Sequence, residues 1–163
     1  MQMFTMNDLF EIAIKMEKNG EAVYSNAAEK IKNSELKSLL EWMADEEASH
    51  ARWFLNKKNT LSMGKEEARL KEMVPQGLQD MMGEKTLSLN EVDFNKIKTV
   101  SGLMETFTGF ENDTILFYEL LEMFIEDKTV LNGLKQIILE EKKHVEKLRS
   151  MQNSCTENLT ADK

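Results

Sequence analysis

The chain carries one set of reactive side chains twice at a fixed spacing, and this repeat constrains the fold more than any other feature. Each member of the second set lies 94 residues after its counterpart, since 111 − 17 and 144 − 50 both give 94. Both histidines of the sequence belong to the sets. The first set is Glu17, Tyr24, Glu46, Glu47 and His50, and the second is Glu111, Tyr118, Glu140, Glu141 and His144. Such a repeat predicts two copies of one structural unit.

Each copy has the pattern of a helical hairpin. Apolar residues recur at steps of three and four through the segments that carry the two sets, which is typical of amphipathic helices. Polar breaks at 31–34 and 126–128 lie midway between the paired glutamates of each set and predict turns. An antiparallel hairpin therefore places a Glu level with a Glu-x-x-His pair, whose members share one helical face. We predict an all-α fold, a four-helix bundle of two hairpins related by a pseudo-twofold axis.

The sequence predicts one domain with a long connection in its middle. The bundle is expected over residues 1–152, with the third helix beginning after Thr99. The residues from about 57 to 98 interrupt the helical pattern and include the one proline of the chain, so we interpret them as a crossover between the hairpins. The polar residues 153–163 are expected to form a C-terminal tail.

Charge and composition narrow the partners and the compartment. The formal net charge of −8, without a basic cluster, argues against nucleic acid and against an anionic membrane as partners. No apolar stretch is long enough to span a membrane. The single cysteine, Cys155, cannot form an internal disulfide, and the N-terminus has no signal pattern, so we expect a cytoplasmic protein.

The position of the charged residues predicts a metal site. Glutamate and histidine occupy the middle of each apolar stripe, where an isolated buried carboxylate is very costly. Two divalent cations would neutralise four carboxylates, and two imidazoles would complete the ligand set, as in bundles that bind two iron or manganese ions. The six candidate metal ligands are Glu17, Glu47, His50, Glu111, Glu141 and His144.

The sequence leaves two interpretations open for the tyrosines beside the candidate ligands and assigns the two remaining glutamates to the surface. Tyr24 and Tyr118 lie seven residues after a candidate ligand, and they are either core tyrosines or catalytic-site residues that donate hydrogen bonds to the ligand carboxylates. Glu46 and Glu140 are expected to be exposed, because the spacing of three residues selects the following glutamate as the ligand.

Trp42 and Trp53 are eleven residues apart, so they share one face of the second helix. We expect that face to point away from the metal site and both indoles to be largely buried, under either the crossover or a second subunit, while the equivalent face of the fourth helix stays solvated.

The residues of the two sets, with their neighbours, resemble the rubrerythrin-like branch of the ferritin-like superfamily. The resemblance rests on Met16-Glu17 to Val23-Tyr24, Ala44 to His50, Phe110-Glu111 to Phe117-Tyr118, and Glu140 to His144. It implies an up-down-down-up bundle with a dinuclear iron site. In that site, Glu47 and Glu141 would bridge the metals. The terminal ligands would be Glu17 with His50 and Glu111 with His144.

The chain departs from the best-known members of that family in two respects. Those members carry a rubredoxin domain with four cysteines, whereas this sequence has one cysteine. They also have an additional Glu three residues after the ligand of the third helix, where this chain has Thr114, and the equivalent position of the first helix is Gly20.

Three classes of function remain open. The resemblance favours a redox enzyme in which two iron ions reduce peroxide or oxygen to water, with electrons from a separate, rubredoxin-like donor protein. The second class is a ferroxidase or another iron-handling protein, and the third is a non-catalytic bundle with a structural dimetal site. Manganese can replace iron in any of them, since carboxylate-rich sites accept both metals. The resemblance also leads us to expect a homodimer.

Overall fold

The structure, a computed structural model, describes residues 6–58, 60 and 94–154, and four long helices make up most of them. The helices are α1 (Met6–Lys30), α2 (Ser34–Lys58), α5 (Val100–Glu122) and α6 (Lys128–Ser154), and a short 3₁₀ helix, η2 (Phe94–Lys96), precedes α5. The all-α prediction is therefore confirmed. No helix among these residues is both long and apolar enough to cross a membrane.

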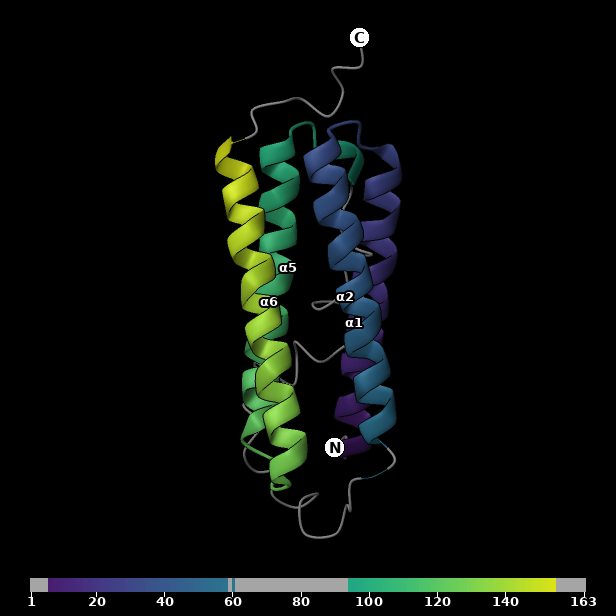
Figure 1. Cartoon of the computed structure of the whole chain (residues 1–163), viewed down its shortest axis with the longest axis vertical. Coiled ribbons are helices and arrows are strands. Elements are labelled where there is room, and N and C mark those ends of the chain that lie inside the picture. Colours follow the sequence, from purple (N-terminus) through teal and green to yellow (C-terminus); the bar gives the residue numbers. More distant parts are fainter. Residues whose placement is uncertain (1–5, 59, 61–93, 155–163) are drawn as a thin grey trace.

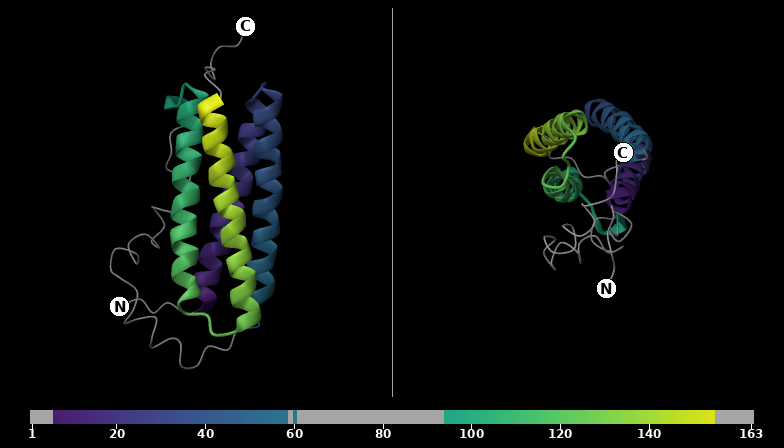
Figure 2. Two further views of the ribbon diagram at one scale, coloured as in Figure 1. Left: turned by 60° about the vertical axis from the view of Figure 1, so that its left-hand side comes forward. Right: turned by 90° about the horizontal axis from the view of Figure 1, so that it is seen from below.

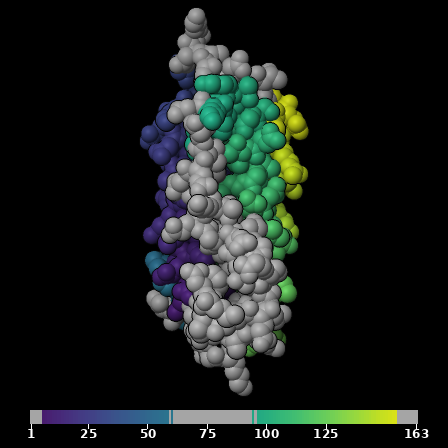
Figure 3. Space-filling model, turned by 180° about the vertical axis from the view of Figure 1, so that it is seen from behind, coloured from purple at the N-terminus to yellow at the C-terminus, as the bar shows by residue number. Residues whose placement is uncertain are grey.

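The helices form a bundle of two antiparallel hairpins that lie side by side. Figure 1 shows α1 rising from the end marked N, α2 descending, α5 descending and α6 rising, which is the expected up-down-down-up order. The end-on view places α2 beside α6 and α1 beside α5 (Figure 2). From behind, α5 occupies the surface between α1 and α6 (Figure 3). Packing is closest within each hairpin, whereas the shortest contacts of the candidate ligands cross from one hairpin to the other.

Side chains at the helix starts fix where each hairpin turns. The Asn33 side chain accepts a hydrogen bond of 3.0 Å from the amide of Leu36 at the start of α2. Asp127 accepts from the amides of Thr129 and Val130 at the start of α6. Both residues satisfy amides that the first turn of a helix cannot pair internally. The turns predicted at 31–34 and 126–128 are thus where the structure has them.

The third helix begins as predicted, directly after Thr99. The Thr99 hydroxyl accepts a hydrogen bond of 3.0 Å from the amide of Gly102, and its backbone is extended at this point. This capping contact sets the start of α5. The rotational position of every later residue of the helix, including Glu111, follows from it.

Two apolar clusters fill the bundle, one toward each end. The first contains residues from the beginning of α1 and the loop between α5 and α6, with Phe10, Phe117 and Leu134 fully enclosed. The second contains residues from the opposite end, among them Leu40 and Phe107. The buried charged residues lie between the two clusters along every helix, so apolar side chains separate them from solvent at both ends of the bundle.

Two sequence predictions fall largely outside the described residues. Most of the crossover expected at 57–98 does so, as does the tail from residue 155 onward. Within the described residues, α2 continues to Lys58 and α6 to Ser154, so both helices run slightly past the boundaries expected for them.

The expectation that the tryptophan face of the second helix points away from the metal site is wrong. Both tryptophans are half-buried at the contact between α2 and α6. Trp53 packs on Phe10 and Phe54, and its indole lies so close to Gly133 of α6 that a Cβ there would be 2.5 Å from a ring carbon. Trp42 packs against His144. The face that carries the tryptophans is therefore the face that α2 turns to α6.

Candidate metal centre

Six side chains from four helices meet in the layer between the two apolar clusters. Each helix contributes the residues that the repeat predicts, and each is at most 2 % exposed. They are Glu17 from α1, Glu47 and His50 from α2, Glu111 from α5, and Glu141 and His144 from α6. The structure thus brings together all six residues that the sequence spacing predicts as ligands.

The six side chains form two overlapping groups with two glutamates in common. In one group, Nδ1 of His50 lies 2.9 Å from Glu141 and 3.5 Å from Glu17. The two groups are Glu17, Glu47, His50 and Glu141, and Glu47, Glu111, Glu141 and His144, with one candidate ligand atom from each residue within 4.8 Å of the others.

In the other group, Nδ1 of His144 lies 3.1 Å from Glu47, 3.1 Å from Glu141 and 3.5 Å from Glu111. Glu47 and Glu141 belong to both groups, which is the geometry that two carboxylates shared between two cations require.

The two tyrosines connect the hairpins across this layer. The Tyr24 hydroxyl of α1 donates a hydrogen bond of 2.6 Å to Glu111 of α5. The Tyr118 hydroxyl of α5 donates one of 2.5 Å to Glu17 of α1. Burial and the nearby carboxylates raise the pKa of both phenols, so they remain protonated donors. Each tyrosine therefore orients the carboxylate of the opposite hairpin, and their catalytic role stays a prediction.

Burial and mutual charge make the protonation of the carboxylates unequal. Burial, followed by the charges of Glu141 and Glu17, raises the pKa of Glu47 well above its usual range. Burial and the charge of Glu141 likewise raise the pKa of Glu111 to about 8. Burial alone would raise the pKa of Glu17 as well, but hydrogen bonds with Glu47 and His50 outweigh it and lower that pKa.

The imidazoles respond in the opposite sense to the carboxylates around them. Burial alone would lower the pKa of His50, but hydrogen bonds with Glu141 and Glu17 raise it to about 12. Burial is similarly outweighed at His144, where Glu111 and Glu141 raise the pKa to about 10. Without metal, the cluster therefore holds protons on both imidazoles near neutral pH, and these protons occupy the place of cationic charge.

The unsatisfied atoms of the cluster test whether it fits a metal pair. One oxygen of each of the four glutamates is buried and has no hydrogen-bond partner among the described residues, and the same is true of both ring nitrogens of His144. Buried polar atoms almost always make a hydrogen bond, so a set of ligand atoms at one place that make none needs an explanation. Carboxylate oxygen and imidazole nitrogen are ligands for iron and manganese. The residues therefore fit two divalent cations.

The structure corrects the expected exposure of Glu46 and Glu140, which are both half-buried. Glu140 lies 2.7 Å from Nε2 of His50, on the side of the ring opposite the metal cluster. The two glutamates and His50 form a third close group. The doubled Glu-Glu of each repeat was the available signal, because a second carboxylate at the same place in both copies is unlike a solvated helix face.

The two positions that depart from the family pattern lie beside the centre. The Thr114 hydroxyl donates to the backbone carbonyl of Phe110 on its own helix, so it is not directed at the cluster. A Cβ at Gly20 would lie 3.2 Å from a carboxylate oxygen of Glu47. Gly20 thus leaves room for the Glu47 side chain, and neither position supplies a seventh ligand.

Comparison with known proteins gives a family match and a similar fold. The model of the rubrerythrin family matches residues 8–152. Among solved structures, the fold is similar to that of a ferritin-like diiron-carboxylate protein from Thermotoga maritima, with a TM-score of 0.69 and 23 % sequence identity over 94 % of this chain and 97 % of that one. No curated protein matches the chain.

Proposed function

The chain belongs to the rubrerythrin family, and we propose that it binds two iron ions and reduces hydrogen peroxide or oxygen to water with electrons from a separate donor protein. One observation carries the proposal: two four-residue groups of buried ligand atoms share Glu47 and Glu141. The unpaired carboxylate oxygens at the same place support it. Four carboxylates suit iron and manganese alike, and the choice of iron rests on the family.

The proposal assigns each ligand by its place in the two groups. Glu47 and Glu141 would bridge the ions, because they alone belong to both groups. Glu17 with His50 would complete one position, and Glu111 with His144 would complete the other. When bound, an iron pair supplies two electrons, one from each ferrous ion, and two protons complete the conversion of hydrogen peroxide to two water molecules.

The surrounding residues orient the ligands and limit access to them. Tyr24 and Tyr118 hold the carboxylates of Glu111 and Glu17 through hydrogen bonds. Such outer partners fix ligand geometry and contribute to metal affinity. The apolar clusters at both ends keep bulk water from the layer. Glu140, half-buried and bonded to His50, links the layer to solvent and is suited to pass protons toward it.

Reoxidation of the reduced protein tests the proposal. We expect metal analysis to find about two iron ions per chain, as in other bundles of this type. The anaerobically reduced protein should then be oxidised by stoichiometric peroxide in a stopped-flow spectrometer. Binding of two ions without reoxidation would instead identify a structural metal site. Continued oxidation of added ferrous iron, with more than two iron ions retained per chain, would identify an iron-handling protein.

A further inference from the structure

The two halves of the repeat treat their histidines differently. Nε2 of His50 lies 2.7 Å from Glu140, and Glu46 lies close to both. In a symmetric site Glu46, the counterpart of Glu140, would serve His144 in the same way. Instead Glu46 joins the group around His50, and Nε2 of His144 has no hydrogen-bond partner among the described residues.

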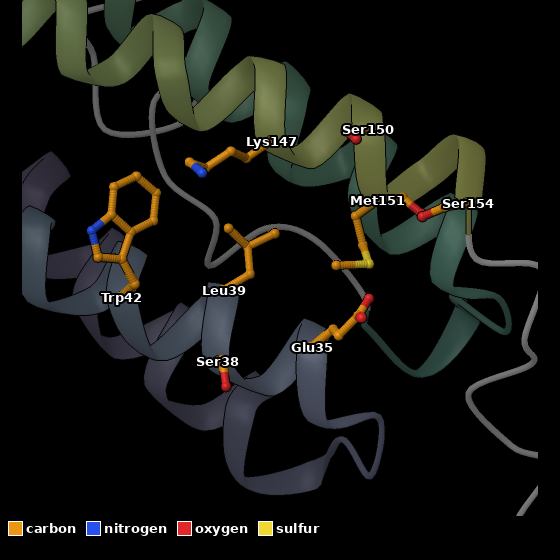
Figure 4. Close-up of a pocket in the computed structure, with 8 residues that line it drawn as sticks. All are labelled: Glu35, Ser38, Leu39, Trp42, Lys147, Ser150, Met151 and Ser154. Atoms are coloured by element: carbon orange, nitrogen blue, oxygen red, sulfur yellow. The ribbon is translucent and has the colours of Figure 1, made fainter.

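The residue that packs against His144 from outside the ligand cluster is Trp42. Its indole packs edge-on against the His144 ring, with centroids 5.1 Å apart and an interplanar angle of 82°. The Lys147 ammonium lies 5.3 Å from the centre of the same indole. Figure 4 shows both side chains in a groove of about 410 Å³ between α2 and α6. The counterpart of Trp42 is Gln136, whose amide donates to Glu140. Outside the ligand cluster, one histidine thus contacts carboxylates and the other contacts an indole.

We propose that the two metal positions are inequivalent and fill in order, the Glu17/His50 position first and the Glu111/His144 position second. This inference rests on the proposed function, since it presupposes a centre of two ions. It concerns which ion binds more tightly, and therefore which half of the centre stays filled when metal is scarce.

Charge is the first reason for the order. A cation beside His50 lies near Glu46 and Glu140 in addition to the carboxylates of the centre itself. Outside the cluster, His144 is in contact with the Trp42 indole, and the positive Lys147 ammonium lies against that indole. Because Coulomb energy is larger away from bulk water, the two extra carboxylates favour a divalent ion at the first position.

Ligand basicity is the second reason. A metal-bound histidine that donates its other ring N–H to a carboxylate is a stronger ligand and is held in one orientation. His50 has this partner in Glu140 and His144 does not. Since both ions share Glu47 and Glu141, the second also meets the positive charge of the first. These effects act in one direction, so the half-filled state accumulates.

Titration with Co²⁺ alone tests the order, because its visible absorption counts bound ions and its binding can be measured in competition with a chelator. The reporter protein is Trp53→Phe, which leaves Trp42 as the one indole. We expect two ions per chain in two resolved steps, with Trp42 emission falling mainly in the second. Glu140→Gln should weaken the first step roughly 10- to 100-fold, the usual effect of losing such a partner, and leave the second nearly unchanged.

Two further variants separate local from general effects. Glu146→Gln removes the same charge from an exposed position of α6 and should change neither step. Glu46→Gln should weaken the first step, whereas a symmetric centre would show the loss in the second. Trp42 emission that falls mainly in the first step, or equal weakening of both steps by Glu140→Gln, would overturn the inference and leave the proposed function intact. Binding of fewer than two ions would overturn the proposed function itself.

Discussion

The metal-free protein should lose stability as pH rises from about 6.5 to 8.5. In this range the native state holds protons that the unfolded chain has largely lost: Glu111 has a pKa of about 8 in the native state against 4.5 in the unfolded chain, and His144 has one of about 10 against 6.5. A group whose pKa is raised by folding stabilises the native state fully below its unfolded pKa, and that contribution is lost as pH rises toward the folded pKa. Carboxyl and imidazole groups here act in the same direction.

The size of the effect follows from the number of excess protons. Each proton bound in the native but not the unfolded state costs about 1.4 kcal/mol of stability per pH unit. A single one therefore removes about 3 kcal/mol over two pH units, and additional protons increase the loss. For a domain of this size that corresponds to a fall in Tm of roughly 6–12 °C. Metal binding requires deprotonated ligands, so the loaded protein should lack this dependence and its apparent metal affinity should rise with pH.

Thermal unfolding of chelator-treated protein at pH 6.5, 7.5 and 8.5 measures the effect cleanly, because both histidines of the chain lie in the cluster. Glu111→Gln keeps the shape of the neutral acid but cannot ionise, so its metal-free Tm should fall less with pH than that of the unchanged protein. Glu119→Gln, at an exposed position of the same helix, is the matched control. A constant or rising Tm in the metal-free protein, or a Glu111→Gln variant with an unaltered slope, would refute the protonation argument.

Two further predictions concern the ligands and the packing. Glu47→Ala and Glu141→Ala should each lose more bound metal than Glu17→Ala, because a shared carboxylate serves both ions; equal losses in metal analysis would contradict the bridging assignment. Gly133→Ala places a Cβ 2.5 Å from an indole carbon, whereas Gly109→Ala meets nothing within 4 Å. We expect overpacking to cost the first variant about 1–3 kcal/mol and the second to gain about 0.5–1 kcal/mol from helix propensity, as chemical denaturation would show.

The helices and the ligand layer could be predicted because local rules determine them. Asn33, Thr99 and Asp127 cap helices through contacts within three residues, which sequence spacing reveals directly. In an antiparallel hairpin, residues equally far from a short turn lie side by side. The positions of Glu17 and Glu47 at the same height in the bundle could therefore be predicted without tertiary information. A lone Glu-x-x-His is common on solvated helices, so it does not by itself indicate a metal site. Its presence at the same place in both copies does.

The surroundings of the histidines could not be predicted in the same way, because they depend on how one hairpin rotates against the other. Trp42, Glu46, His50 and Trp53 follow one another at steps of four, four and three, and this stripe faces α6. The spacings of five and six residues from Glu47 placed the tryptophans on a different helical face from the metal ligands. His50, however, lies three residues before Trp53 and extends the metal face toward the tryptophans. Helix α2 contacts both α1 and α6, and His50 lies at the boundary between these two contact faces.

The asymmetry of the centre lies where the two copies differ, and a repeat search is insensitive to those positions. The ligand residues are the same types in both halves, so on their own they would bind the two ions equally. The pairs Trp42/Gln136 and Thr114/Gly20 differ, and each pair borders the centre. Pseudo-symmetry therefore builds a site for two ions, whereas the departures from it determine that the ions are not equivalent. In a duplicated bundle the unmatched neighbours of matched ligands are the residues through which two metal positions acquire different affinities.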